Sequence, residues 1–164
     1  MNINETLKHY FGYDSLRPGQ QELIEGILQR KDVLGIMPTG AGKSLCYQVP
    51  ALMLDGITIV VSPLISLMTD QVKALNQAGV HAAYINSSLT ENQIRTALFY
   101  AAQGRYKIIY VAPERLNTIR FLEFACQVDI SMVTVDEAHC ISQWGQDFRP
   151  SYVGIADFLA QLPK

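Results

Sequence analysis

Short apolar runs rich in Val and Ile alternate along this chain with longer segments of helical spacing, and the alternation limits the folds that are possible. Each run is closed by Pro, Gly, Ser or Asp, which mark turns. The runs are too uniformly apolar to leave one face in water, so they predict parallel strands with helices on both faces. The expected strands are Val33–Met37, Ile57–Val61, His81–Ile85, Lys107–Val111 and Ile130–Val135.

Helical spacing fills the segments between these strands, and Thr90 is suited to cap one of the helices. At 164 residues, with 49% hydrophobic residues, the chain is expected to form one globular α/β domain. Two further helices are expected before the first strand. The predicted helices are Asn4–Tyr10, Pro18–Gln29, Lys43–Leu54, Leu64–Asn76, Thr90–Gln103 and Pro113–Cys126.

Composition excludes several classes of protein. Thirteen Lys and Arg against fifteen Asp and Glu give a net charge of -2, so bulk charge offers no argument for a nucleic-acid partner. The cysteines, Cys46, Cys126 and Cys140, form no C-x-x-C pair, which argues against a disulfide framework and a zinc site and favours the cytoplasm. No apolar run approaches the roughly 18 residues that span a bilayer, so neither export nor membrane insertion is expected.

A glycine-rich segment, Met37–Ser44, lies between a predicted strand and a predicted helix. Gly40 and Gly42 would let the backbone curl around phosphate oxygens, while Lys43 would reach the β and γ phosphates and the Ser44 hydroxyl would bind Mg²⁺. A methionine replaces the first glycine of the usual phosphate-loop pattern. The alternative is a glycine-rich turn with an incidental lysine, and the strand-to-helix context favours nucleotide binding.

Two adjacent acids, Asp136 and Glu137, follow the last apolar run. A phosphate loop predicts such a carboxylate at the end of another strand, and Asp136 is the natural partner for Mg²⁺. Glu137 would orient and deprotonate the water that attacks the γ-phosphate. The alternative is a solvated pair or a helix cap, which the upstream phosphate loop disfavours. His139 has no metal-ligand partner at a suitable spacing and is not assigned as a ligand.

An aromatic tract comes directly after the acids. Trp144 and Phe148 would stack on unpaired bases, and Arg149 would contact phosphate or a base face, which suits sequence-independent binding of a single strand. The alternative is one apolar helix face, because Trp144 and Phe148 are four residues apart. Gly145 and Pro150 make a regular buried helix less favourable.

Three segments together, Thr39–Ser44, Asp136–His139 and Trp144–Pro150, resemble the RecQ helicases. The resemblance implies a three-layer RecA-like motor domain of the DEAH-box kind that uses ATP and Mg²⁺. It further implies 3′-to-5′ unwinding of single-stranded or forked DNA in recombination and repair. It also implies that Thr39 and Ala41 help to hold the nucleotide, although Ala41 stands where the family usually has Gly.

The segment Phe11–Gln20 resembles the adenine-recognition motif of the family. By that resemblance, Gln20 reads the adenine edge while Tyr13 and Arg17 pack around the base. A Gln amide donates and accepts at once, which suits adenine. The alternative is a helix that starts at proline and exposes its glutamine. Leu16 replaces a usual Phe here, and Gln146 replaces a usual His in the aromatic tract.

Two further strand-to-helix turns resemble DNA-contacting motifs of the family. In the first, Val60–Gln71, the hydroxyls of Ser62 and Ser66 would contact DNA phosphates. In the second, Tyr110–Leu116, Glu114 and Arg115 are equally suited to form an ion pair or to contact DNA.

The resemblance also predicts that residues 1–164 are a first motor domain cut near its C-terminal end, because the Ser/Thr-Ala-Thr turn expected next does not occur. By the same resemblance, we expect the second motor domain, the zinc module and the winged helix of the family to lie outside these 164 residues. We expect this fragment to bind nucleotide weakly, to hydrolyse it slowly and not to unwind duplex. Its partners would be DNA and the second motor domain, and its location the cytoplasm, or the nucleoid in a bacterium. An RNA helicase and a binding module without catalysis are the rival functions.

Overall fold

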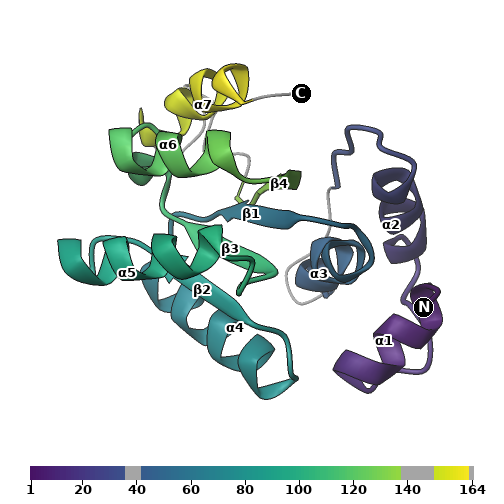
Figure 1. Cartoon of the computed structure of the whole chain (residues 1–164). Coiled ribbons are helices and arrows are strands. Elements are labelled where there is room, and N and C mark those ends of the chain that lie inside the picture. The colour runs from purple at the N-terminus through teal and green to yellow at the C-terminus, as the bar shows by residue number, and fades with distance from the viewer. Residues whose placement is uncertain (36–41, 138–149, 163–164) are drawn as a thin grey trace. The chain divides into compact units, whose positions relative to one another are not determined.

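The computed structural model describes residues 1–35, 42–137 and 150–162 (Figure 1). The chain divides into two compact units, Met1–Asp55 and Gly56–Lys164. Within the described residues, no helix has both the length and the apolar character needed to cross a membrane.

The first unit is helical. Its helices are α1 (Ile3–Phe11), α2 (Gln20–Leu28) and α3 (Lys43–Met53), and α3 packs against both of the others. Leu7, Ile24 and Val49, one from each helix, form its fully buried core. The three predicted helices are therefore confirmed, with ends within two residues of those expected.

The predicted strand Val33–Met37 is wrong for its described part. Residues 33–35 have no regular secondary structure, and residues 36 and 37 lie outside the described chain. A β-strand requires a neighbour for its N–H and C=O groups. None of the described strand pairings includes this segment, so its apolar sequence alone does not make it a strand.

The second unit contains a parallel sheet in the order β2-β3-β1-β4. In register, Val61 pairs with both Val111 and Val135, and Ile85 pairs with Val111, so the carboxyl ends of all four strands are level. The strands agree with the predicted runs to within one residue: β1 is Ile57–Val61, β2 is Ala82–Ile85, β3 is Ile108–Val111 and β4 is Ile130–Val135.

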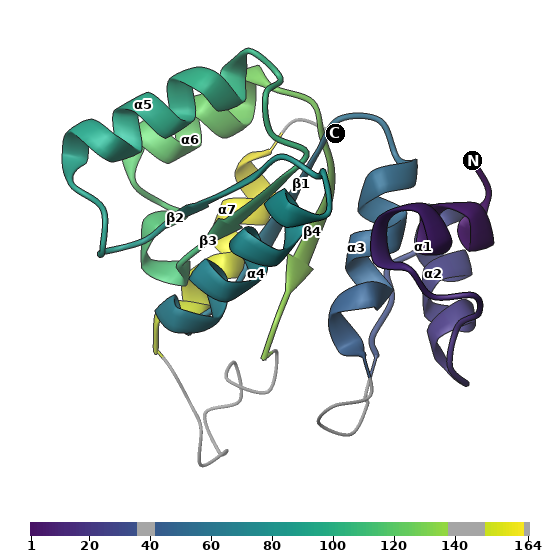
Figure 2. The ribbon, with the colours of Figure 1, turned by 90° about the horizontal axis from the view of Figure 1, so that it is seen from below.

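Helices cover both faces of this sheet, as predicted (Figure 2). On one face lies α4 (Ile65–Gln77), and on the other lie α5 (Glu91–Ala102), α6 (Ile119–Gln127) and α7 (Ile155–Gln161). The main core is on the second face, where alternate strand residues such as Ile59 meet Phe121 and Phe158. Thr90 caps α5 by accepting a bond from the N–H of Gln93, which confirms the predicted cap. The three-layer α/β fold is confirmed.

The predicted helix Pro113–Cys126 is two elements. A 3-10 turn at Pro113–Arg115 comes first, and α6 begins only at Ile119. Thr118 separates them, since its backbone is extended with ψ 146° and its hydroxyl donates to the Arg115 carbonyl at 2.8 Å. A Thr side chain that bonds the local backbone favours such a break. The structure also contains a 3-10 helix at Pro150–Gly154 that leads into α7, and neither was predicted.

Candidate functional site

The described end of the predicted phosphate loop is the start of α3, where Gly42, Lys43 and Ser44 form what we call the phosphate turn. Gly42 has φ 74° and precedes the helix without any side-chain cap. The first turn contains no acid, and the exposed Lys43 is its first residue. A lysine at a helix N-terminus is opposed by the helix dipole, and a bound anion would offset that repulsion. The geometry of Gly42, Lys43 and Ser44 therefore fits phosphate, whereas the predicted Thr39, Gly40 and Ala41 lie outside the described residues.

Gln20 is tied to this turn. Its side-chain N–H donates to the Gly42 carbonyl at 3.0 Å, and its side-chain oxygen accepts from the Arg17 N–H at 2.7 Å. The side chain is only 1% exposed, so the alternative of an exposed helical glutamine is wrong. A Cβ at Gly42 would lie 2.5 Å from the Gln20 nitrogen, which means that this contact also requires glycine. Gln20 therefore connects the predicted adenine motif with the turn at Gly42 through hydrogen bonds.

The other two residues predicted to surround adenine are exposed. Tyr13 is 54% exposed, and Arg17 lines an open hollow of about 450 Å³ beside α2. Neither Tyr13 nor Gln20 lines that hollow. The structure therefore does not gather the three predicted adenine contacts into one cavity.

In the second unit, the level carboxyl ends of the strands bring polar residues to one edge of the sheet. Ser62 follows β1, Asn86 follows β2, and Asp136 follows β4. This edge is where ligands bind in open parallel sheets. The topology confirms the expectation that the acids are delivered to it.

Asp136 and Glu137 form a turn, the acidic turn, whose backbone is held by hydrogen bonds. The N–H of Asp136 donates to the Val61 carbonyl at 2.8 Å, which extends the β1–β4 ladder by one residue. The N–H of Glu137 then donates to the Asp136 carboxylate at 3.0 Å. Glu137 has φ 56°, a left-handed conformation that is costly for a residue with a Cβ and that recurs at functional sites. Both acids are half-buried, so ligands can still reach them.

Tyr152, which belongs to none of the predicted motifs, also forms a hydrogen bond with this turn. Its hydroxyl donates to the main-chain carbonyl of Asp136 at 2.7 Å, and its side chain is 0% exposed. No local pattern marks it, because it is 16 residues from Asp136. Its position is a product of the tertiary fold.

The two serines that were predicted to contact DNA phosphates, Ser62 and Ser66, differ in their exposure. Ser62 is 1% exposed, and its hydroxyl accepts a bond from the Leu64 N–H at 3.5 Å. Ser66, in the first turn of α4, is exposed. Burial favours a structural role for Ser62, so a phosphate contact at this turn is more readily made by Ser66.

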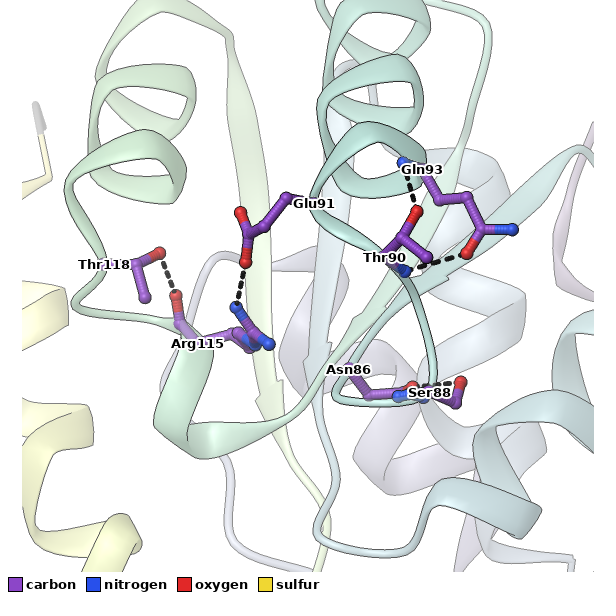
Figure 3. A network of polar contacts seen from close by, with 7 residues as sticks. All are labelled: Asn86, Ser88, Thr90, Glu91, Gln93, Arg115 and Thr118. Atoms are coloured by element: carbon purple, nitrogen blue, oxygen red, sulfur yellow. Dashed lines mark hydrogen bonds and ion pairs between the residues drawn. The ribbon is translucent and has the colours of Figure 1, made fainter.

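A polar network occupies the neighbouring turns of the same edge (Figure 3). Arg115 forms an ion pair with Glu91 at 3.4 Å, so its ionic partner is not the exposed Glu114 beside it. Asn86, which is 0% exposed, accepts from the Ser88 N–H at 2.9 Å and thereby folds the turn after β2. An Asn that closes its own turn in this way has a sequence signal, namely Asn-Ser-Ser directly after an apolar strand.

The remaining predicted site residues cannot be placed. Trp144, Phe148 and Arg149 lie outside the described residues, as does His139. Their roles stay predictions. Among the described residues, neither Cys46 nor Cys126 forms a disulfide. Burial raises the pKa of the Cys46 thiol, which makes it a poor nucleophile at neutral pH.

Known proteins resemble this chain over nearly its whole length. The family model described as DEAD/DEAH box helicase matches residues 17–164. An ATP-dependent DNA helicase RecQ from Bacillus subtilis is 53% identical over 157 residues, which cover 95% of this chain and 27% of that protein. Its counterpart from Haemophilus influenzae is 47% identical over 158 residues, covering 96% and 26% respectively. The resemblance to RecQ helicases is confirmed, and the chain spans about a quarter of the length of these relatives.

A solved structure has the same fold. The structure described as a hypothetical ATP-dependent RNA helicase from Sulfolobus tokodaii superposes with a TM-score of 0.73 and 22% identity, over 98% of this chain and 47% of the other. At that identity the likeness concerns the fold alone. The family match, the parallel sheet and the acids at its carboxyl edge agree, and the chain belongs to the DEAD/DEAH box helicase family.

Proposed function

We propose that this chain is the ATP-binding part of a RecQ-type DNA helicase that moves 3′ to 5′ on single-stranded or forked DNA. The observation that carries the proposal is the 53% identity to a RecQ helicase across 95% of the chain. The chain would be the first motor domain, and a second motor domain of the same polypeptide would be its partner. Recombination and repair, in the cytoplasm or nucleoid, are the corresponding roles.

ATP and Mg²⁺ are the proposed ligands. Lys43 and the backbone of Gly40–Ser44 would hold the phosphates, and Ser44 and Asp136 would bind the metal. When bound, Mg²⁺ supplies positive charge that neutralises the phosphate oxygens. The uncapped start of α3 and the exposed Lys43 support this assignment.

Glu137 is the proposed general base. Its carboxylate would take a proton from the water that attacks the γ-phosphate. A left-handed backbone at φ 56° is maintained here, although it is unfavourable for glutamate, and this supports a specific task for its side chain.

Gln20 would read adenine, with Tyr13 and Arg17 beside the base. Its amide also bonds the Gly42 carbonyl, so recognition of the base would affect the phosphate turn directly. Thr39 and Ala41 would complete the nucleotide-binding loop.

DNA contacts are proposed for exposed Ser66 and for the aromatic tract with Trp144, Phe148 and Arg149. Ser62 was predicted to join them, but its burial makes it the weakest member of the set. Stacking on aromatic rings would suit unpaired bases of any sequence.

The rival function is RNA unwinding, and one experiment separates the two. Steady-state ATP turnover of the full-length protein is measured without nucleic acid, with single-stranded DNA and with RNA of the same sequence and length. We expect strong stimulation by DNA and little by RNA. Equal or greater stimulation by RNA would reject the DNA assignment, and no turnover under any condition would reject the motor assignment.

A further inference from the structure

Tyr152 lies in the core of the second unit with only its hydroxyl directed to the acidic turn. Its ring belongs to the same buried cluster as Phe121 and Phe158. A buried phenol requires a polar partner, since burying an unpaired hydroxyl costs free energy. The Asp136 carbonyl, 2.7 Å away, is such a partner. The core therefore fixes the ring, and the ring fixes the position of the hydroxyl.

The carbonyl that Tyr152 holds belongs to the peptide that joins the two acids. A peptide group is planar, so the carbonyl of Asp136 and the N–H of Glu137 move together. The hydroxyl of Tyr152 holds the carbonyl end of this plane, and the Asp136 carboxylate accepts from its N–H end at 3.0 Å. Rotation of the plane would break both bonds. These bonds help to hold Glu137 in its left-handed conformation.

The backbone around Tyr152 is itself held in place. The side-chain N–H of Asn117 donates to the Gly154 carbonyl at 2.9 Å, which ties the 3-10 helix of Tyr152 to the segment between β3 and α6. Among the described residues, Asn117 forms hydrogen bonds with Gly154 and Gln161. It therefore offers an independent way to loosen Tyr152.

We propose that Tyr152 is a positioning residue for Asp136 and Glu137. By holding the peptide plane between them, it would orient the Asp136 carboxylate toward bound Mg²⁺ and the Glu137 carboxylate toward the attacking water. This inference rests on the proposed ATP-dependent function. It assigns a role to a residue that no ATP-binding motif in the sequence includes.

The test compares Tyr152→Phe with the wild type in the full-length protein. The substitution keeps the ring and removes the hydroxyl. Loss of one hydrogen bond predicts a kcat for ATP about three- to tenfold lower, with KM little changed. Equilibrium binding of a fluorescent ATP analogue gives a second readout. Binding in EDTA should stay within about twofold of wild type, while the gain in affinity on adding Mg²⁺ should shrink by about the same factor as kcat.

Phe158→Leu is the control, because Phe158 packs in the same cluster and donates no hydrogen bond. It should lower the melting temperature while leaving kcat and the Mg²⁺-dependent gain within about twofold of wild type. Equal losses of kcat in both variants at matched stability would overturn the proposal and leave Tyr152 as a packing residue. Asn117→Ala should act as Tyr152→Phe does, but more weakly, and serves as the test if the tyrosine variant does not fold.

The outcomes also separate this inference from the function on which it rests. A wild-type protein without ATP turnover would reject the proposed function, and the positioning role with it. A wild-type protein that hydrolyses ATP, with Tyr152→Phe and Asn117→Ala indistinguishable from it, would reject the positioning role alone.

Discussion

Two turns carry the residues proposed for ATP chemistry, and each contains a residue in the left-handed region. At the start of α3 that residue is Gly42, with φ 74°, and after β4 it is Glu137, with φ 56°. Glycine adopts this conformation without steric cost, whereas a residue with a Cβ requires its surroundings to enforce it. Gly42 therefore suits its left-handed conformation by its own identity, whereas hydrogen bonds with Val61 and Tyr152 hold the turn that contains Glu137.

The largest expected effect concerns the charge at the phosphate turn. Lys43→Ala in the full-length protein should lower kcat/KM for ATP by about a hundredfold or more, because a group that stabilises developing charge is typically worth that much. Lys31→Ala, at another exposed lysine of the first unit, is the control and should have no effect. Equal kinetics for the two variants would remove Lys43 from the proposed site.

The phosphate turn should require glycine at position 42. Gly42→Ala introduces a Cβ at φ 74° and 2.5 Å from the Gln20 nitrogen, whereas Gly12→Ala, at φ 76°, meets no atom within 4 Å. We expect Gly12→Ala to cost about 1 kcal/mol of folding free energy and Gly42→Ala about 2–3 kcal/mol. Chemical denaturation measures both. Similar losses would show that the Gln20 contact does not crowd this turn.

The bond from Gln20 to the phosphate turn predicts a smaller effect. Gln20→Ala should cost about 1–2 kcal/mol of stability, because it leaves the Gly42 carbonyl and the Arg17 N–H without this partner. Gln21→Ala removes only an exposed bond to Glu25 and should cost less than about 0.5 kcal/mol. Thermal unfolding measures the loss of stability in the two variants, and equal losses would show that the bonds of Gln20 do not stabilise this turn.

The smallest effect concerns strain in the acidic turn. Glu137→Asn should be more stable than Glu137→Ala by about 0.5–1 kcal/mol, because Asn tolerates the left-handed region. Both variants should lose ATP turnover. If denaturant unfolding finds Ala as stable as Asn at this position, then the turn relaxes freely and the contrast between the two turns fails.

Elements fixed by local pattern were predictable from sequence, and those fixed by distant contacts were not. The strand Ile57–Val61 and the Thr90 cap follow from neighbouring residues, and both are confirmed. The segment at residues 33–35 has strand-like composition, but strand formation also needs a paired neighbour.

The same division applies to the candidate site. Asp136 and Glu137 are recognisable as a pair at a strand end, and the structure places them there. The role of Tyr152 could not be predicted from local sequence, because its partner Asp136 is 16 residues away. The same holds for the bond from Gln20 to Gly42, which spans 22 residues. Short-range spacing identifies groups that do chemistry, whereas only the folded chain shows what holds them.

Glu137→Gln in the full-length protein is the sharpest test of Glu137 as the general base of ATP hydrolysis. Steady-state ATP turnover with saturating single-stranded DNA is measured alongside equilibrium binding of ATP. We expect turnover to fall by at least about a hundredfold while ATP affinity stays within a few-fold of wild type, because the amide keeps the shape of the side chain and loses its basicity. Turnover that matches wild type would contradict the assignment of Glu137.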